Sequence, residues 1–355
     1  MKKVLAAILC LPLLVPAAAW SEGGPADERG QVRTFAALPD GVRLPEGIAA
    51  NPVNGDIYVG TFDGGGKNKL LRYSRNGKLL ATRDFGATPL LGLEFDRAHR
   101  KVYITNVGDF AGAKSKIQRI AADFDSGSAV EDVAEIPKIG APGPRTVDNP
   151  DGSQDTIAFG SGARVPNALT FDHAGNLYIS DSFQGAVFRI DNPASCSQTC
   201  PVQTWIHDPL LATAGFPPFG ANGLVFNADE SALFIANTGD DRVLKIANGA
   251  ISVFAESING ADGLVFDRQG RLWVCANQAD QVVALNASGR VIAQLGSFEG
   301  IGKDGAPKGL LFPASPVIVG DEMFVTNLAI ALTPATGDEP EEDVTRWTVS
   351  RIKLP

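Results

Sequence analysis

Two stretches of the sequence are nearly the same but differ in one side chain that could do chemistry. "GANGLVFNADESALFIA" begins at Gly220 and "GADGLVFDRQGRLWVCA" at Gly260, and Asn222 in the first becomes Asp262 in the second. When further copies of this pattern are aligned, the residue ahead of each buried run is Glu46, Leu91, Asn167, Asn222, Asp262 and Ser315. Two carboxylates, two carboxamides and a hydroxyl therefore occupy one repeat position.

If the repeats bring these polar side chains together, their burial requires a bound ligand. Two facing carboxylates repel each other and lose solvation. A hard divalent cation removes the conflict, because Ca²⁺ takes six to eight oxygen ligands and two carboxylates neutralise its charge. Zinc, copper and nickel favour imidazole or thiolate, which this set lacks. Mg²⁺ fits less well, because it demands a more regular geometry.

The repeats themselves indicate the elements that position these side chains. Related stretches begin at Pro45, Leu91, Pro166 and, more weakly, Ala314. Each combines a short apolar strand, a polar turn and a second strand, and a third strand often follows. Radial stacking into a β-propeller buries such units. We predict an all-β, six-bladed propeller rather than a β-sandwich, which would not explain the repeated phrases.

In a propeller the innermost strand of each blade borders the central channel, so equivalent residues at its head form a ring around the axis. The sequence therefore predicts that the side chains at these six positions lie together and that their oxygens bind a hard divalent cation, with Ca²⁺ favoured. The chain ends suit closure of the ring, because Arg33–Leu38 and Arg346–Leu354 both read as strands. Their pairing in the last blade would remove exposed edges.

Long insertions interrupt the pattern at the blade junctions. They span Pro137–Arg164, Asp208–Gly220, Ser297–Phe312 and Leu328–Asp343. Loops gathered over one end of a rigid scaffold usually serve binding, so we expect these insertions to crowd the face on which the inner strands begin. Leu210, Leu211, Phe216 and Phe219 are expected to form an apolar lip there.

The order and spacing of "EGIA", "PNALTFD", "NGLVFN" and "DGLVFD" resemble the gluconolactonase/senescence-marker superfamily, related to paraoxonases and diisopropyl-fluorophosphatases. The resemblance covers Arg33 to Pro355. It implies that Glu46, Asn167, Asn222 and Asp262 hold a catalytic Ca²⁺. It also implies that Asp262 is the general base or nucleophile, while Glu46 mainly anchors the ion.

This chain departs from the family pattern at two places. Leu91 stands where paraoxonases carry a histidine implicated in proton transfer. Sugar-lactone enzymes have an arginine two residues before the first Asn, and here that residue is Val165, with Arg164 one step away. These differences, with the apolar lip, favour a more hydrophobic ester or lactone than a sugar lactone.

Other reactive residues are expected to be structural. His99 and His173 lie in polar turns, and His207 begins an insertion. No G-x-S-x-G motif supports an α/β-hydrolase nucleophile. "DNPDGSQD" at Asp148–Asp155 lacks the terminal Glu of a calcium loop and has Pro150 at its third position, so it reads as a solvated loop. The polar residues that close the second strands are interpreted as turn formers: Asn106, Asp181, Asn237, Asn277 and Asn327.

The amino terminus has the pattern of a secretory signal peptide. Lys2 and Lys3 precede an apolar run, and Ala17–Ala19 offers a cleavage site. We expect a signal peptide at 1–19, a linker at 20–32 and one propeller domain at 33–355, in a secreted or periplasmic monomer with no membrane span after cleavage. The net charge of −9 argues against a nucleic-acid partner.

The cysteines fit an exported protein. Cys196 and Cys200 lie in a polar loop, where a local disulfide is favoured over zinc because no second ligand pair completes a zinc site. Cys275 alternates with apolar residues and is expected to be a buried free thiol.

The sequence thus predicts an exported, Ca²⁺-dependent hydrolase acting on a small lactone or ester. Two alternatives remain open. One is a non-catalytic binding module with a structural Ca²⁺. The other is a metal-free enzyme resembling strictosidine synthase, which would not need the Glu/Asn/Asn/Asp set.

Overall fold

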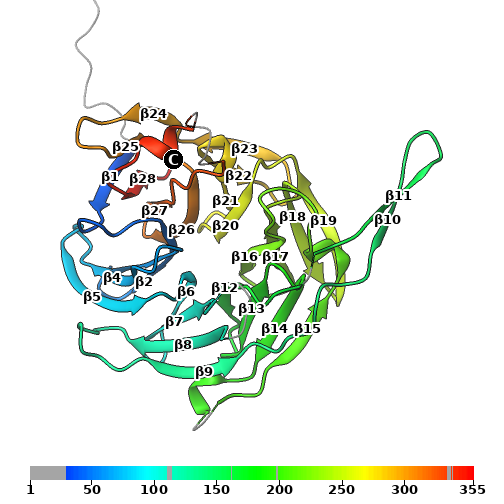
Figure 1. The fold of residues 1–355 in the computed structure, drawn as a ribbon, viewed down its shortest axis with the longest axis horizontal. Helices are drawn as coiled ribbons and strands as arrows, with labels where there is room; N and C mark the ends of the chain where they lie inside the picture. The colour runs from blue at the N-terminus through cyan, green and yellow to red at the C-terminus, as the bar shows by residue number, and fades with distance from the viewer. Residues whose placement is uncertain (1–28, 110–113, 161, 197–198, 334–336, 338) are drawn as a thin grey trace, which may run out of the picture.

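The computed structural model describes residues 29–109, 114–160, 162–196, 199–333, 337 and 339–355. Six four-stranded sheets are arranged radially about a common centre (Figure 1). The prediction of an all-β, six-bladed propeller is confirmed. The predicted signal peptide lies outside the described residues. None of the described helices has the length and apolar character needed to cross a membrane.

Five blades run outward from the centre in chain order, with every neighbouring pair of strands antiparallel. Blade 1 contains β2 (Pro45–Ala50), β3 (Ile57–Thr61), β4 (Asn68–Tyr73) and β5 (Leu79–Gly86), and blade 2 contains β6 (Leu90–Asp96), β7 (Lys101–Asn106), β8 (Lys116–Ala121) and β9 (Glu131–Glu135). Blade 3 contains β12 (Pro166–Phe171), β13 (Leu177–Asp181), β14 (Ala186–Ile190) and β15 (Gln203–His207). Blade 4 contains β16 (Ala221–Phe226), β17 (Leu233–Asn237), β18 (Arg242–Ala247) and β19 (Ala250–Glu256), and blade 5 contains β20 (Ala261–Phe266), β21 (Leu272–Ala276), β22 (Gln281–Leu285) and β23 (Val291–Leu295).

Blade 6 closes the ring with both ends of the domain. It contains β26 (Pro313–Val319), β27 (Glu322–Asn327), β28 (Thr348–Lys353) and, outermost, β1 (Val32–Ala37). β1 pairs with β28 from Val32 opposite Ile352 to Ala37 opposite Thr348. The predicted closure by the terminal strands is confirmed.

Apolar side chains of neighbouring blades form the core between them. In one such cluster Phe234 and Val243 of blade 4 pack with Leu264 and Val274 of blade 5. Comparable clusters occupy the other blade junctions in the described part of the chain. Alternate residues of one strand pack against opposite neighbouring blades, because Tyr58 lies in the cluster shared with blade 2 and Val59 in the cluster shared with blade 6.

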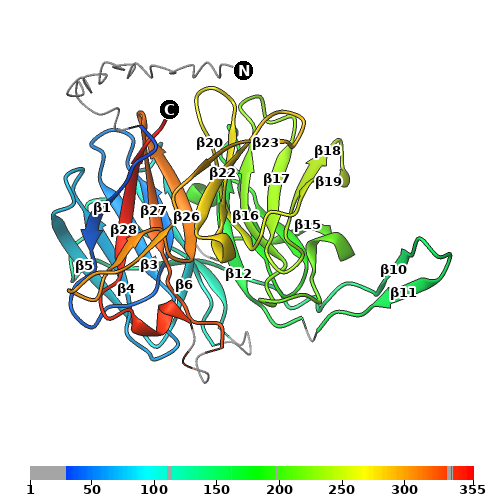
Figure 2. The same cartoon turned by 90° about the horizontal axis from the view of Figure 1, so that it is seen from above.

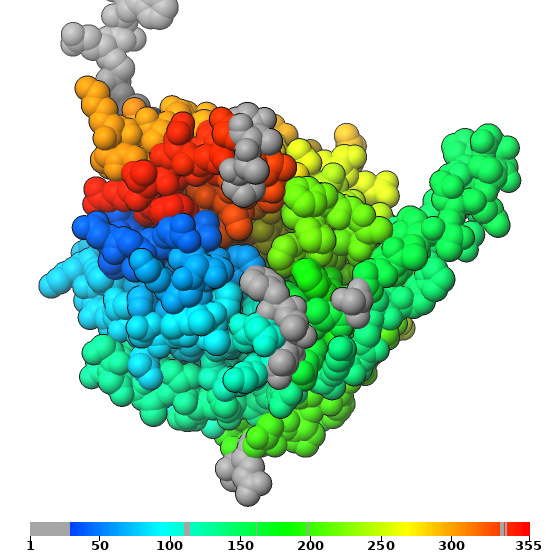
Figure 3. Space-filling view, viewed as in Figure 1, coloured from blue at the N-terminus to red at the C-terminus, as the bar shows by residue number. Residues whose placement is uncertain are grey.

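The insertions differ in where they go. The first forms a hairpin of β10 (Arg145–Asp148) and β11 (Gln154–Ile157), which projects sideways from the body (Figures 1, 2 and 3). At the base of this hairpin, Arg145 Nη2 forms an ion pair with Asp240 Oδ2 of blade 4 at 3.4 Å. The expectation that this insertion crowds the site face is therefore wrong for its outer part, because its contacts lead outward to blade 4 rather than inward. The "DNPDGSQD" loop forms its exposed tip.

Another insertion forms a hairpin of β24 (Phe298–Ile301) and β25 (Pro307–Gly309), beside the short helix η4 (Pro340–Asp343). Other short helices in the described part of the chain are η1 (Pro193–Ser195), η2 (Pro209–Leu211) and η3 (Asn277–Ala279).

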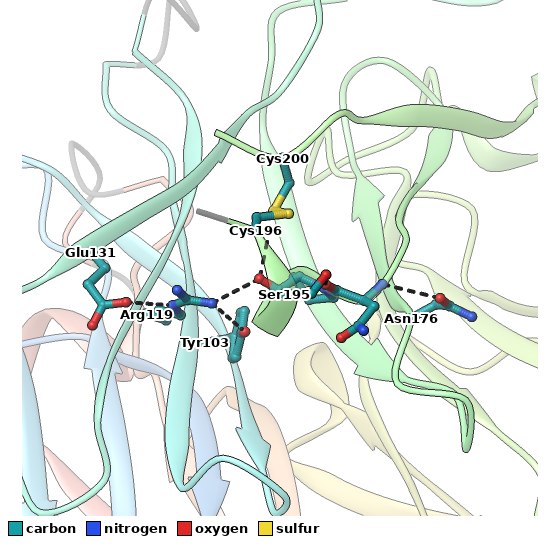
Figure 4. The surroundings of a disulfide bond; sticks show 9 residues. Tyr103, Arg119, Glu131, Asn176, Ser195, Cys196 and Cys200 are labelled. Atoms are coloured by element: carbon teal, nitrogen blue, oxygen red, sulfur yellow. Dashed lines mark hydrogen bonds and ion pairs between the residues drawn. A yellow bond between two sulfur atoms is a disulfide. The ribbon is translucent and has the colours of Figure 1, made fainter. Parts of the chain in front are cut away.

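A disulfide joins Cys196 to Cys200, and Cys275 is a buried free thiol, both as predicted. The disulfide loop docks on blade 2, where the Cys200 backbone N–H donates to the Val133 carbonyl at 2.7 Å. Figure 4 shows Arg119 of blade 2 reaching toward this loop between Glu131 and Tyr103. The loop therefore holds blades 2 and 3 together.

Candidate metal and active site

A bulge at the head of each inner strand turns one side chain toward the axis. In β2 the register shifts between Pro45 and Ile48, so Glu46 and Gly47 lie in the shift. The inner strands of the other blades have the same shift. A bulge re-aims a side chain that would otherwise alternate across the sheet. This local irregularity is what brings the polar residues to the central channel.

Hydrogen bonds between blades fix the ring residues in place. Thr326 Oγ1 donates to the Glu46 backbone carbonyl at 2.7 Å, Thr105 Oγ1 to that of Asn167 at 2.7 Å, and Ser180 Oγ to that of Asn222 at 2.6 Å. Each donor is on the second strand of the preceding blade, so closure of the propeller locks the ring.

The ring consists of Glu46, Leu91, Asn167, Asn222, Asp262 and Ala314. The sequence alignment was therefore wrong in the last blade, where it assigned Ser315. Pro313 pairs with Asn327 and Pro316 with Val325, as Pro45 pairs with Thr61 and Ile48 with Val59 in blade 1. Ser315 thus takes the place of Gly47, and the ring residue is Ala314.

The two asparagines present defined faces to the channel. Thr238 Oγ1 donates its single proton to the Ala261 carbonyl at 2.7 Å, so it accepts from the Asn222 amide at 2.9 Å. Ser182 Oγ likewise donates to the Ala221 carbonyl and accepts from the Asn167 amide at 2.9 Å. Both amide nitrogens are committed to these hydroxyls, which leaves both Oδ1 atoms as acceptors for a ligand.

The two carboxylates of the ring are buried and lack partners for part of their oxygens. Glu46 is 4 % exposed and Asp262 is 3 % exposed. The described residues supply no hydrogen-bond donor to Glu46 Oε2 or Asp262 Oδ1. Burial, with repulsion from Asp262, raises the pKa of Glu46 well above its usual range. Burial also raises the pKa of Asp262 to about 7, although the hydrogen bond from Asn277 and the nearby Asn222 side chain oppose the rise.

This donor set fits a hard divalent cation. It offers two carboxylates with unpartnered buried oxygens and two carboxamide oxygens, the ligand types that Ca²⁺ takes. Among the described residues, no three His, Cys, Asp or Glu side chains form a cluster that could hold an ion by themselves. The set therefore depends on amide oxygens, which a zinc site does not favour.

An apolar pocket of about 70 Å³ opens onto the ring. Its volume corresponds to roughly five water positions. Glu46, Asn167, Asn222 and Asp262 all line it, so the structure brings the four predicted residues to one pocket. Its apolar walls are Phe62, Leu91, Pro217, Phe219, Phe312, Leu328, Ile330 and Leu332.

The apolar lip was only partly predicted. Phe219 lines the pocket, but Leu211 is fully buried and packs with Leu210 in the core between blades 3 and 4. Phe216 is 59 % exposed. Helix η2 explains the difference, because its turn directs Leu211 into the protein. The walls come instead from the ends of other insertions, at Phe312 and Leu328.

Other candidates lie away from the pocket or play structural roles. Arg164 Nη1 donates to Glu135 at 2.8 Å and to the Ile136 carbonyl at 3.0 Å, so its charge is engaged by blade 2. His99 pairs with Asp96 in a turn, as expected. Burial, together with the charges of Asp262 and Glu46, raises the pKa of the Cys275 thiol well above its usual range. A nucleophilic thiolate is therefore disfavoured at that position.

Sequence reasoning missed one group of residues at the site. Asn277 was interpreted as a turn former, yet its Nδ2 donates to Asp262 Oδ2 at 2.9 Å and the residue lines the pocket. The amide fixes one oxygen of Asp262 and leaves the other free. Ser182 and Thr238 likewise fix the amide nitrogens of Asn167 and Asn222 and leave the amide oxygens available. The missed signal was that Asn277 lies one residue beyond the end of its strand, unlike Asn237.

The burial of the two carboxylates predicts a pH-dependent stability when divalent cations are removed. A raised folded-state pKa means that the folded protein binds more protons than the unfolded chain, so stability falls as pH rises. We expect the melting temperature in chelator to fall by several degrees between pH 5 and pH 8. Thermal melts at constant ionic strength measure this. A flat or rising profile would contradict it, and Glu46→Gln should reduce the slope.

No protein-family model and no curated protein sequence matches this chain. Its fold, by contrast, matches solved structures. A gluconolactonase from Xanthomonas campestris is 16 % identical, with TM-score 0.54 over 92 % of this chain and 89 % of that one. A calcium-binding protein, regucalcin, from Agrobacterium tumefaciens is 15 % identical, with TM-score 0.56 over 90 % and 96 %.

A virginiamycin B lyase from Staphylococcus aureus is 13 % identical, with TM-score 0.55 over 92 % of this chain and 99 % of that one. At such identities the likeness establishes a shared fold, and one fold carries several chemistries. The predicted resemblance to the gluconolactonase/senescence-marker superfamily is confirmed at the level of that fold.

Proposed function

We propose that this protein is an exported, Ca²⁺-dependent hydrolase that acts on a small apolar lactone or ester. The observation that carries the proposal is the ring of buried oxygens beneath an apolar pocket, with Glu46 Oε2 and Asp262 Oδ1 unpartnered. Glu46, Asn167, Asn222 and Asp262 would hold the ion. The names of two structural relatives, a gluconolactonase and a calcium-binding protein, agree with this choice. The signal-peptide pattern supports export.

When bound, Ca²⁺ would polarise the substrate's carbonyl or phosphoryl oxygen and stabilise the charge that develops on it. Asp262 is the candidate general base, and the Asn277 amide orients its carboxylate through Oδ2. In hydrolysis, Asp262 takes a proton from water as the water oxygen bonds to the carbonyl carbon. The carbon–oxygen bond to the leaving alkoxide then breaks, and the proton passes to that alkoxide.

The pocket favours a neutral, apolar substrate. No Lys or Arg of the described residues lines it, and Arg164 is held by Glu135 on blade 2. Buried polar groups are needed to recognise a polyol, whereas hydrocarbon walls recognise an alkyl or aryl group. An aryl ester or an alkyl-substituted lactone therefore fits better than a sugar lactone.

Metal removal tests the proposal. We expect chelation to abolish hydrolysis of aryl esters and lactones and to lower the melting temperature, and added Ca²⁺ to restore both. A ligand at a hundred times its dissociation constant stabilises the folded state by about 2.7 kcal/mol. A restored melting temperature without hydrolysis would favour the binding module. Hydrolysis that survives chelation would favour the metal-free enzyme.

A further inference from the structure

The residue that follows the second strand of each blade forms another ring, next to the first. Its backbone N–H donates to the carbonyl of the residue two places before the ring residue in all six blades, for example Ser182 to Val165 at 3.0 Å and Asn277 to Gly260 at 3.0 Å. We call these residues the second ring: Phe62, Val107, Ser182, Thr238, Asn277 and Leu328. The shared bond shows that they are structural equivalents.

Blades 3, 4 and 5 have polar residues in the second ring, and each one bonds to the ring residue of its own blade. Ser182 accepts from Asn167, Thr238 accepts from Asn222, and Asn277 donates to Asp262. All three are almost fully buried, at 2 %, 1 % and 2 % exposure respectively. Their hydrogen bonds set the direction of the first-ring oxygens.

Blades 6, 1 and 2 have apolar residues at the same position. Phe62 and Leu328 line the pocket, and Val107 packs behind Leu91. Phe62 lies edge-on to Phe219, with ring centroids 6.3 Å apart. Trp347 Nε1 donates to the Leu328 carbonyl at 3.1 Å and so fixes the backbone there. The first ring is apolar in two of these blades as well, at Leu91 and Ala314.

We propose that this division gives the pocket two halves with separate tasks. The polar half, over blades 3 to 5, orients three of the four side chains that would bind the cation, Asn167, Asn222 and Asp262, while Glu46 of blade 1 faces them as the fourth. The apolar half, over blades 6, 1 and 2, receives the hydrocarbon part of the substrate. This inference rests on the proposed function, and it adds that the substrate binds in one orientation, with its alkyl or aryl group toward Phe62 and Leu328.

The polar half is tested by Thr238→Val, which keeps the shape of the side chain and removes the hydroxyl that accepts from Asn222. We expect Ca²⁺ affinity, measured by calorimetry, to fall roughly tenfold or more, as for other residues that orient metal ligands. Thr238→Ser should restore it, which a merely structural loss would not explain. The preference among substrates of different chain length should stay unchanged.

The apolar half is tested with the variant Leu328→Ala, by measuring KM for p-nitrophenyl esters of increasing acyl length. We expect KM for the longer esters to rise roughly tenfold, as expected for lost hydrocarbon contacts, with KM for the acetate changed little. Calorimetry should show wild-type Ca²⁺ affinity. Thr238→Val should therefore change Ca²⁺ affinity alone, and Leu328→Ala should change the KM for long esters alone.

Either variant can overturn the inference. Unchanged Ca²⁺ affinity in Thr238→Val would show that the second ring does not orient the ligands. An equal effect of Leu328→Ala on short and long esters would show that the apolar half does not hold the acyl group. If wild-type protein hydrolyses none of the esters, the proposed function fails. In that case calorimetry can still measure the binding of Ca²⁺ and of uncleavable alkyl ketones to the two variants, which tests the polar and apolar halves without hydrolysis.

Discussion

Asp262→Asn is expected to lower the rate of ester hydrolysis about 10³-fold while leaving the fold intact. The substitution keeps the size of the side chain and removes the only carboxylate in the ring that an amide already orients, through Asn277. A positioned general base accounts for roughly 10² to 10⁴ in rate, and loss of one charged ligand should also weaken Ca²⁺ binding. Saturating Ca²⁺ in the assay separates the two effects.

Without Ca²⁺, the same substitution should stabilise the folded protein. Asp262 is buried, and its raised pKa shows that ionisation is unfavourable there without a cation. Removal of the carboxylate should therefore raise the melting temperature in chelator at pH 8, even as activity is lost. A variant that is both inactive and less stable in chelator would point to misfolding instead.

Glu94→Gln is the matched control for this variant. Glu94 is another carboxyl on an inner strand, and burial raises its pKa to about 7. It lines the opposite part of the central channel and does not line the apolar pocket. We expect its turnover to match wild type. Full activity in Asp262→Asn would remove the assignment of Asp262 as base, whatever the control shows.

The sequence was sufficient to predict the architecture and most of the ring. Inner-strand heads in blades 1, 2, 4 and 5 share a glycine after the ring residue, and blade 3 has Ala168 there. The small residue at this position made the repeats of these five blades easy to align in sequence. Blade 6 has Ser315 instead, and the alignment slipped by one. A hydroxyl in place of glycine was mistaken for a ligand, because only strand pairing shows which residue lies in the bulge.

The pocket walls and the second ring were harder to predict for a physical reason. The path of an insertion depends on contacts distant in sequence, such as Arg145 with Asp240, which leads the first insertion outward. Asn277 and Asn237 look alike in sequence, yet Asn237 Nδ2 donates to the Leu210 and Ala212 carbonyls and organises a loop. One residue of offset decides which of them reaches the pocket.

The glycines that follow four of the six ring residues link the fold to the site. A Cβ at Gly47 would overlap with the Leu91 carbonyl oxygen of the next blade, and one at Gly92 with the Asn167 carbonyl oxygen. These are backbone atoms of ring residues, which cannot move without displacing a neighbouring strand. At Gly47 and Gly92 the close approach of neighbouring inner strands therefore requires a residue without a side chain.

Gly47→Ala is accordingly expected to destabilise the protein by roughly 3 kcal/mol, the upper part of the usual range for overpacking. For a domain of this size that lowers the melting temperature by about 4 to 5 °C. Ca²⁺ affinity should fall as well, because Glu46 and Leu91 are displaced together. Gly160→Ala is the control, since a Cβ there meets nothing within 4 Å. If Gly47→Ala melts like that control and binds Ca²⁺ normally, close inner-strand contact does not set the ring.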